Sequence, residues 1–227
     1  KIYDEMTDFA KYAFNKSHAA AYAVVSYQTA WLKYYYPVEY MAALMTSVID
    51  NPGKVAEYIY SCRQMGIKIL PPDINHGYSS FSADNGSIRY GLAAIKSIGR
   101  PVIKEIVAER KANGEFKNLK DFIERMSGKD INKRTIENFI KSGAFDELGG
   151  TRKQFMVIYV QILDQVNREK KNSMTGQMSL FDIVGEEQKS EFDIPLPNVG
   201  EYEKSTKLAF EKEVLGIYLS GHPMEEY

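Results

Sequence analysis

The sequence predicts a mainly α-helical chain with one small β-hairpin, paired helix units, a polar linker and a terminal helix. Three observations predict this fold class. Apolar side chains recur at steps of three and four residues over most of the chain before residue 165. Asn85-Gly86 lies between two short strand-like runs, which is a strong hairpin signal. Helical periodicity then fades between residues 168 and 200, where polar residues, glycine and proline become common.

Charge is distributed unevenly along the 227 residues, although the net charge is only -1. Residues 1–87 carry a net charge of -1, residues 88–175 carry +7, and residues 176–227 carry -7. The middle third therefore has the charge expected of a surface that faces a polyanion. The acidic last part is more typical of a linker or a protein-facing segment.

Cysteine and histidine usage excludes several kinds of site. The single cysteine, Cys62, excludes an internal disulfide and a cysteine-based zinc or iron–sulfur site. The three histidines are far apart, so we expect no metal site. No apolar run approaches the length of a membrane span, and we expect a cytoplasmic protein with no membrane partner. Because a helical pattern is already running at Lys1, we expect a piece of a longer protein.

The first part of the chain is predicted to form consecutive helices. Residues 4–13 have the pattern of an amphipathic helix end, and a long helix follows to about Tyr36. Pro37 ends this helix and begins the next, and a third helix is stopped by Gly66. The long helix is expected to bury one face, made of Tyr22, Val25, Thr29, Leu32 and Tyr36.

Lys16, Ser17 and His18 lie at the start of the long helix. A cation, a hydroxyl and an imidazole converge there with free backbone N–H groups, which suits a phosphate or triphosphate. The alternative is a capping serine between two solvated side chains. After the third helix, residues 67–70 predict a short strand, and residues 80–83 and 87–90 predict the hairpin.

The stretch from Tyr90 to Val107 predicts a short helix, a tight turn and a second helix. Gly99 can adopt a positive φ, and Pro101 fits the first helical position. The turn would present backbone N–H groups and positive charge to one phosphate of a DNA backbone. The stretch resembles a helix-hairpin-helix motif with a serine as the first turn residue; the alternative is an ordinary turn between core helices. The candidate DNA-binding residues here are Lys96, Ser97, Ile98, Gly99, Arg100 and Lys104.

A second, degenerate unit of the same kind is predicted downstream. Residues 119–126 and 132–141 have helical patterns, a turn follows at residues 142–145, and Thr151 can cap a helix that runs to about Gln165. Arg152 and Lys153 are the DNA-binding candidates of this unit, on the side expected to meet phosphate. The alternative is that these charges form a solvated helix face.

The polar linker contains two apolar side chains that need a pocket. They belong to the sequence Gln177, Met178, Ser179, Leu180 and Phe181, which resembles the bacterial sliding-clamp-binding pentapeptide. A flexible segment could insert this pair into a partner, or the pair could fold back on its own domain. Residues 201–221 then return to a helical pattern.

The run from Phe14 to Tyr40 closely resembles the fingers region of DnaE-type α subunits of bacterial replicative DNA polymerase III. In that family the fingers close over the incoming deoxynucleoside triphosphate (dNTP), which implies that Lys16, Ser17 and His18 line the path of its phosphates. The family's helix-hairpin-helix region follows and grips duplex DNA. Its internal clamp-binding motif comes next, before a junction to an OB domain that this chain lacks.

The resemblance implies a domain order for the chain. Residues 1–80 would form part of the fingers, 81–167 the β-hairpin and helix-hairpin-helix domain, 168–200 the clamp-binding linker, and 201–227 the helical junction. The implied partners are primer–template DNA, the incoming dNTP, the sliding clamp and other replisome subunits. The whole protein would extend a primer with Mg²⁺ held by carboxylates outside this chain, so the fragment alone is expected to be inactive.

Two further readings come from other functional classes. The chain could be a non-enzymatic module that binds DNA and tethers a clamp. A DNA-repair glycosylase with a hairpin motif is disfavoured, because there is no cysteine cluster for an iron–sulfur site and no suitable lysine or aspartate after the hairpin.

Overall fold

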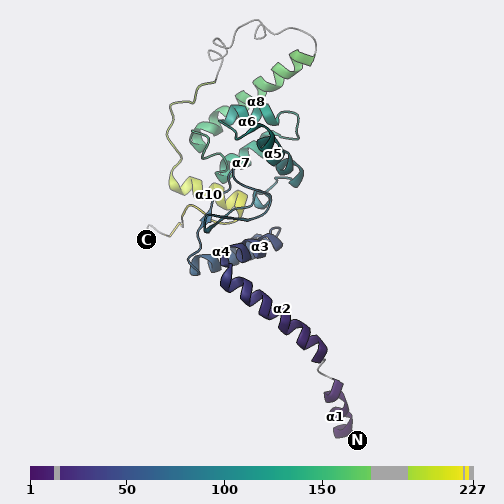
Figure 1. Ribbon diagram of the computed structural model, residues 1–227. Helices are drawn as coiled ribbons and strands as arrows, with labels where there is room; N and C mark the ends of the chain where they lie inside the picture. Colours follow the sequence, from purple (N-terminus) through teal and green to yellow (C-terminus); the bar gives the residue numbers. More distant parts are fainter. Residues whose placement is uncertain (13–15, 175–193, 222, 225–227) are drawn as a thin grey trace.

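The computed structural model describes all residues except 13–15, 175–193, 222 and 225–227 (Figure 1). The described part of the chain is mainly helical, as predicted, with one small sheet. The helices are α1 (Ile2–Tyr12), α2 (Lys16–Tyr35), α3 (Pro37–Ser47), α4 (Pro52–Gln64), the 3-10 helix η1 (Leu92–Ala94), α5 (Arg100–Asn113), α6 (Leu119–Met126), α7 (Lys133–Ser142), α8 (Arg152–Met174) and α10 (Lys204–Leu215). The strands are β1 (Ile69–Leu70), β2 (Ser82–Asp84) and β3 (Ser87–Arg89).

The sheet contains the predicted hairpin. Strands β2 and β3 pair antiparallel around Asn85 and Gly86, whose φ angles are 48° and 79°. Two positive φ angles are what a two-residue hairpin turn requires, and asparagine and glycine tolerate them best. β1 adds to the other edge of β3 in parallel, with Ile69 opposite Ile88, so β3 is the central strand.

One continuous hydrophobic core joins α3 to the segment after α10. It runs from Met41 to Ile217, and it includes a group of aromatic rings in edge-on or tilted contact, Phe122, Phe139 and Phe145. Helix α10 lies beside α7, although some 60 residues separate them in the chain (Figure 1). The core therefore crosses the boundaries at residues 80 and 200 that the resemblance implied.

Helix α2 differs from the prediction, because it has no buried residue. The side chains expected to form its buried face are exposed, including Tyr22, Val25 and Leu32. In Figure 1 this helix extends away from the other elements, and α3 is its principal neighbour. Amphipathic spacing indicates a face able to pack, but burial needs a second surface, and none of the described elements supplies one.

Local signals place the other helices correctly. Asn118 and Asn132 cap α6 and α7 by accepting hydrogen bonds from the amides three residues later. Three elements differ in length from the prediction. The expected first helix of the hairpin is only the 3-10 turn η1, α8 continues nine residues beyond Gln165, and α10 covers only Lys204–Leu215 of the helical pattern expected at 201–221.

Candidate nucleic-acid interface

The turn between η1 and α5 has a left-handed residue, but it is Ser97 rather than Gly99. Ser97 has a φ of 62°, whereas Gly99 is extended, with φ -74° and ψ 141°. The expectation that Gly99 uses a positive φ is therefore wrong. Gly99 instead occupies the N-cap position of α5, where its extended backbone leads into the helix.

The N-terminus of α5 is open. No side chain caps it, no acidic residue lies in its first turn, and Pro101 has no N–H to satisfy. The positive end of the helix dipole is therefore not neutralised by the helix's own side chains. Ile98 is buried and anchors the turn, and its N–H donates to the carbonyl of Ile95. Ile98 thus contributes packing rather than an accessible contact.

Three cations lie within a few residues of this N-terminus in the chain. Lys96, Arg100 and Lys104 are all exposed, as are Ser97 and Gly99. Arg100 forms an ion pair with Asp50 at 3.2 Å, but the two side chains are 64% and 85% exposed, so the pair is weak. The arrangement can hold a phosphate through charge and backbone N–H groups without reading a base.

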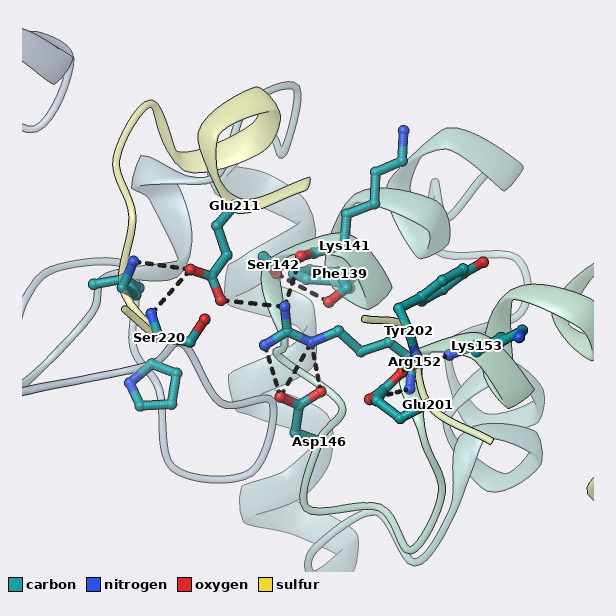
Figure 2. A network of polar contacts seen from close by, with 12 residues as sticks. Phe139, Lys141, Ser142, Asp146, Arg152, Lys153, Glu201, Tyr202, Glu211 and Ser220 are labelled. Carbon is teal, nitrogen blue, oxygen red and sulfur yellow. Dashed lines mark hydrogen bonds and ion pairs between the residues drawn. The ribbon is translucent and has the colours of Figure 1, made fainter. Parts of the chain in front are cut away.

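The second predicted unit does not have this character, and Arg152 is a correction. Its side chain is buried, and its guanidinium lies between the carboxylates of Asp146 and Glu211 (Figure 2). It also donates to the carbonyl of Lys141 at the end of α7. Burial lowers the pKa of Arg152, but the two carboxylates outweigh this effect and raise it. Arg152 therefore joins α7, α8 and α10 instead of facing DNA.

The N-terminus of α8 is already occupied. Thr151 and Gln154 form the reciprocal hydrogen bonds of a capping box, which confirms Thr151 as the cap. The carboxylate of Glu201 accepts hydrogen bonds from the amides of Arg152 and Lys153 (Figure 2). An intramolecular anion thus holds the place where a phosphate was expected. Lys153 is half-buried, with its ammonium 5.9 Å from the centre of the Tyr202 ring.

The connection between α6 and α7 is a further candidate interface, which the sequence patterns did not indicate. It contains two left-handed residues, Gly128 and Asp130, with φ 85° and 55°. Lys133 and Arg134 are exposed in the first turn of α7 that follows. The sequence signal that could have identified it is a glycine turn followed by a capping asparagine and two cations.

The nucleotide-binding candidates lie elsewhere in the molecule. Lys16, Ser17 and His18 are exposed at the beginning of α2, and the His18 ring packs 4.4 Å from the ring of Tyr22. Figure 1 shows the start of α2 far from α5, so these two candidate sites are separate. The clamp-binding candidates Gln177, Met178, Ser179, Leu180 and Phe181 fall outside the described residues.

The described residues contain neither a metal-binding cluster nor a membrane-spanning helix. Among the described residues, no group of three or more His, Cys, Asp or Glu side chains could hold a metal ion. No helix in the same part of the chain is long and apolar enough to cross a membrane.

Comparisons with known proteins give a consistent result. Residues 66–155 match the helix-hairpin-helix motif. The chain is 43% identical to DNA polymerase III subunit alpha of Vibrio cholerae and 42% identical to that of Escherichia coli strain K12, over all of this chain and 20% of each relative. The subunit of Mycobacterium leprae is 41% identical, over 98% of this chain and 19% of the relative. The chain spans about a fifth of these curated relatives, and the predicted family resemblance is confirmed.

Proposed function

We infer that this chain is a segment of a bacterial DNA polymerase III α subunit and that its turn at Lys96–Lys104 binds the backbone of duplex DNA. The observation that carries this proposal is the open N-terminus of α5, which has three exposed cations close to it in the chain and lies inside the match to the helix-hairpin-helix motif. Phosphate contacts of this kind position a protein on DNA and carry little sequence information.

The proposal predicts binding that is independent of sequence and sensitive to salt. The chain would be titrated against labelled duplexes of two unrelated sequences over a range of salt concentrations. Replacing both Arg100 and Lys104 with alanine should weaken binding about equally for both duplexes. The same variant should lower the slope of log affinity against log salt by roughly one to two, because each neutralised phosphate contributes about 0.9.

A matched control removes the same charge elsewhere. Lys54 and Lys68 are exposed, on α4 and before β1, and their double alanine variant should leave the salt slope unchanged. Equal losses in both double variants would point to net charge alone. A loss confined to one duplex would indicate base readout and contradict the proposal.

The nucleotide role is proposed for Lys16, Ser17 and His18. It is supported by their exposure at the start of α2 and by the family resemblance of that stretch. In the whole polymerase, alanine at Lys16 or His18 should raise the KM for the incoming dNTP while DNA affinity stays unchanged. Lys33, near the end of the same helix, provides a control substitution. An unchanged KM in both site variants would remove this role.

The remaining roles concern the whole protein. We propose that it extends primers as a DNA-directed DNA polymerase in the cytoplasm, with Mg²⁺ ligands outside this chain and with other replisome subunits as partners. Gln177, Met178, Ser179, Leu180 and Phe181 would bind the sliding clamp. Alanine at Leu180 and Phe181 should abolish binding of this chain to a purified bacterial clamp. Unchanged binding would exclude the pentapeptide as the contact.

A further inference from the structure

The turn that is proposed to meet DNA is held by residues distant in the chain. The N–H of Lys96 donates to the carbonyl of Val214 at 2.8 Å, and its ammonium donates to the carbonyl of Glu213 at 3.3 Å. The carbonyl of Lys96 accepts a hydrogen bond of 2.8 Å from the side-chain amide of Asn138. Both backbone groups of Lys96 are thus fixed immediately before the left-handed residue Ser97.

Asn138 can hold the carbonyl of Lys96 in place because its side chain is buried on α7. Its side chain is 7% exposed, and its amide points at one backbone carbonyl rather than at solvent. A buried amide held in this way is costly to leave unpaired. The contact therefore fixes the distance between α7 and the turn.

The end of α10 is itself fixed from several sides. The carboxylate of Glu213 pairs with Lys141 of α7 at 2.9 Å, and the carbonyl of Leu215 accepts a hydrogen bond from the buried hydroxyl of Tyr90. The carbonyl of Tyr218, just beyond this helix, accepts a hydrogen bond from Arg63 of α4. The end of α10 thus meets α4, α7 and the turn at one place.

We propose that Asn138 and the residues Glu213–Leu215 form a clasp that holds Ser97 in its left-handed conformation, with Asn138 as a positioning residue for DNA binding. The inference rests on the proposed DNA-binding role of the turn. A left-handed serine is unfavourable by itself, so neighbouring contacts must maintain it. Without the clasp the turn populates other conformations, and apparent affinity falls with the fraction that remains competent.

The test compares the chain with its Asn138→Ala and Asn138→Asp variants. The aspartate keeps the shape of the side chain but replaces the donor with an oxygen that repels the carbonyl of Lys96. Each variant should bind duplex DNA about five- to tenfold more weakly than the parent chain. Adding Ser97→Gly should restore binding to within about twofold, because glycine adopts the left-handed conformation without the clasp.

Asn75 provides a matched control. It also holds a backbone segment, with hydrogen bonds of 3.0 and 2.9 Å to the carbonyl and N–H of Phe116, away from the turn. Asn75→Ala should leave DNA affinity within about twofold of the parent value. An equal loss of affinity in the Asn75 and Asn138 variants, or no rescue by Ser97→Gly, would overturn the clasp.

A second measurement separates the clasp from the proposed function. Amide hydrogen exchange at Lys96 should be about tenfold faster in Asn138→Ala and unchanged in Asn75→Ala. Unchanged exchange at Lys96 in Asn138→Ala overturns the clasp whether or not the parent chain binds DNA. If the parent chain shows no salt-dependent DNA binding, the proposed function fails, and with it the role of the clasp in DNA binding. Faster exchange of the Lys96 amide in Asn138→Ala would then support only the conformational part of the clasp.

Discussion

The guanidinium of Arg152 and the carboxylate of Glu211 form an interior ion pair 3.3 Å long, with side chains only 5% and 2% exposed. The other oxygen of Glu211 accepts hydrogen bonds from the amides of Leu219 and Ser220. One carboxylate thus connects α8 to the segment that follows α10. Removing Glu211 would leave the buried guanidinium with Asp146 as its remaining carboxylate, and it would leave the amides of Leu219 and Ser220 without their acceptor.

We expect Glu211→Ala to lower the free energy of unfolding by about 3–5 kcal/mol, the usual cost of breaking a buried pair. Urea denaturation followed by circular dichroism measures this change. The exposed pair Lys54–Glu57 is the control, with its side chains 51% and 59% exposed. Glu57→Ala should cost less than about 1 kcal/mol. Similar losses in the two variants would show that the interior pair contributes no more than a surface pair.

Two substitutions in the DNA-binding turn should have effects opposite to those suggested by residue type. Ser97→Gly should stabilise the chain, by up to about 1 kcal/mol, because Ser97 is left-handed and glycine adopts that conformation without a steric penalty. Gly99→Ala should change stability by less than about 1 kcal/mol, because Gly99 has a φ that alanine also adopts. Thermal denaturation of both variants decides this. A large loss in Gly99→Ala together with destabilisation by Ser97→Gly would contradict the assigned conformations.

Signals within a few residues predicted much of this fold. The two residues Asn85-Gly86 were enough for the hairpin, and Thr151 for the start of α8, because these features form between near neighbours. The turn at Ser97 was located correctly, but its left-handed residue was not. The conformation of a turn is also decided by contacts such as the one that Lys96 receives from Asn138, 42 residues further along the chain.

Charge at a helix start was a less reliable guide. Arg152 has the sequence context of a phosphate-binding cation, yet its partners include Glu211, 59 residues further along the chain. The backbone amides of Arg152 and Lys153 are occupied by Glu201, also far away in sequence. The predicted burial of the apolar stripe of α2 is wrong for a related reason. An apolar stripe shows that a helix face is able to pack, but it does not show which surface covers that face. Residues distant in the sequence determine whether these side chains are buried or exposed, and the periodicity of the sequence does not identify those residues.

The free energy of unfolding should depend on pH through the carboxylate of Glu109. Hydrogen bonds from Lys129 and then Asn113 and Arg125 lower its pKa to about 2, against an opposing effect of burial. A carboxylate whose pKa falls on folding stabilises the chain above its ordinary value of 4.5, and this contribution disappears as pH falls through about 2. Urea midpoints of the parent chain and Glu109→Gln should therefore differ most above pH 4.5 and converge toward pH 2. Parallel curves over this range would exclude the contribution.

Cys62 should report unfolding through its reactivity. It is fully buried beside Met45, and burial raises the pKa of its thiol to about 11. The reactive thiolate is therefore scarce at pH 8, and the labelling rate should be at least about 100-fold slower than for an unfolded thiol. Labelling with a chromogenic disulfide in native buffer and in urea measures this ratio. Rapid labelling of the native chain would show that α3 and α4 open readily around Cys62.

The pair between Arg100 and Asp50 should limit DNA binding. The two side chains meet at 3.2 Å beside the open end of α5, so Asp50 competes with phosphate for this cation. Asp50→Asn should strengthen duplex binding about two- to fivefold at low salt, and the gain should shrink as salt screens the charges. The substitution should change stability by less than about 1 kcal/mol, because the pair is exposed.

Glu57→Gln removes an equal charge from another exposed pair and controls for net charge. In the Arg100→Ala background, Asp50→Asn should have little effect, because the cation that it releases is absent. An equal gain in the presence and absence of Arg100 would instead mean that Asp50 repels DNA directly.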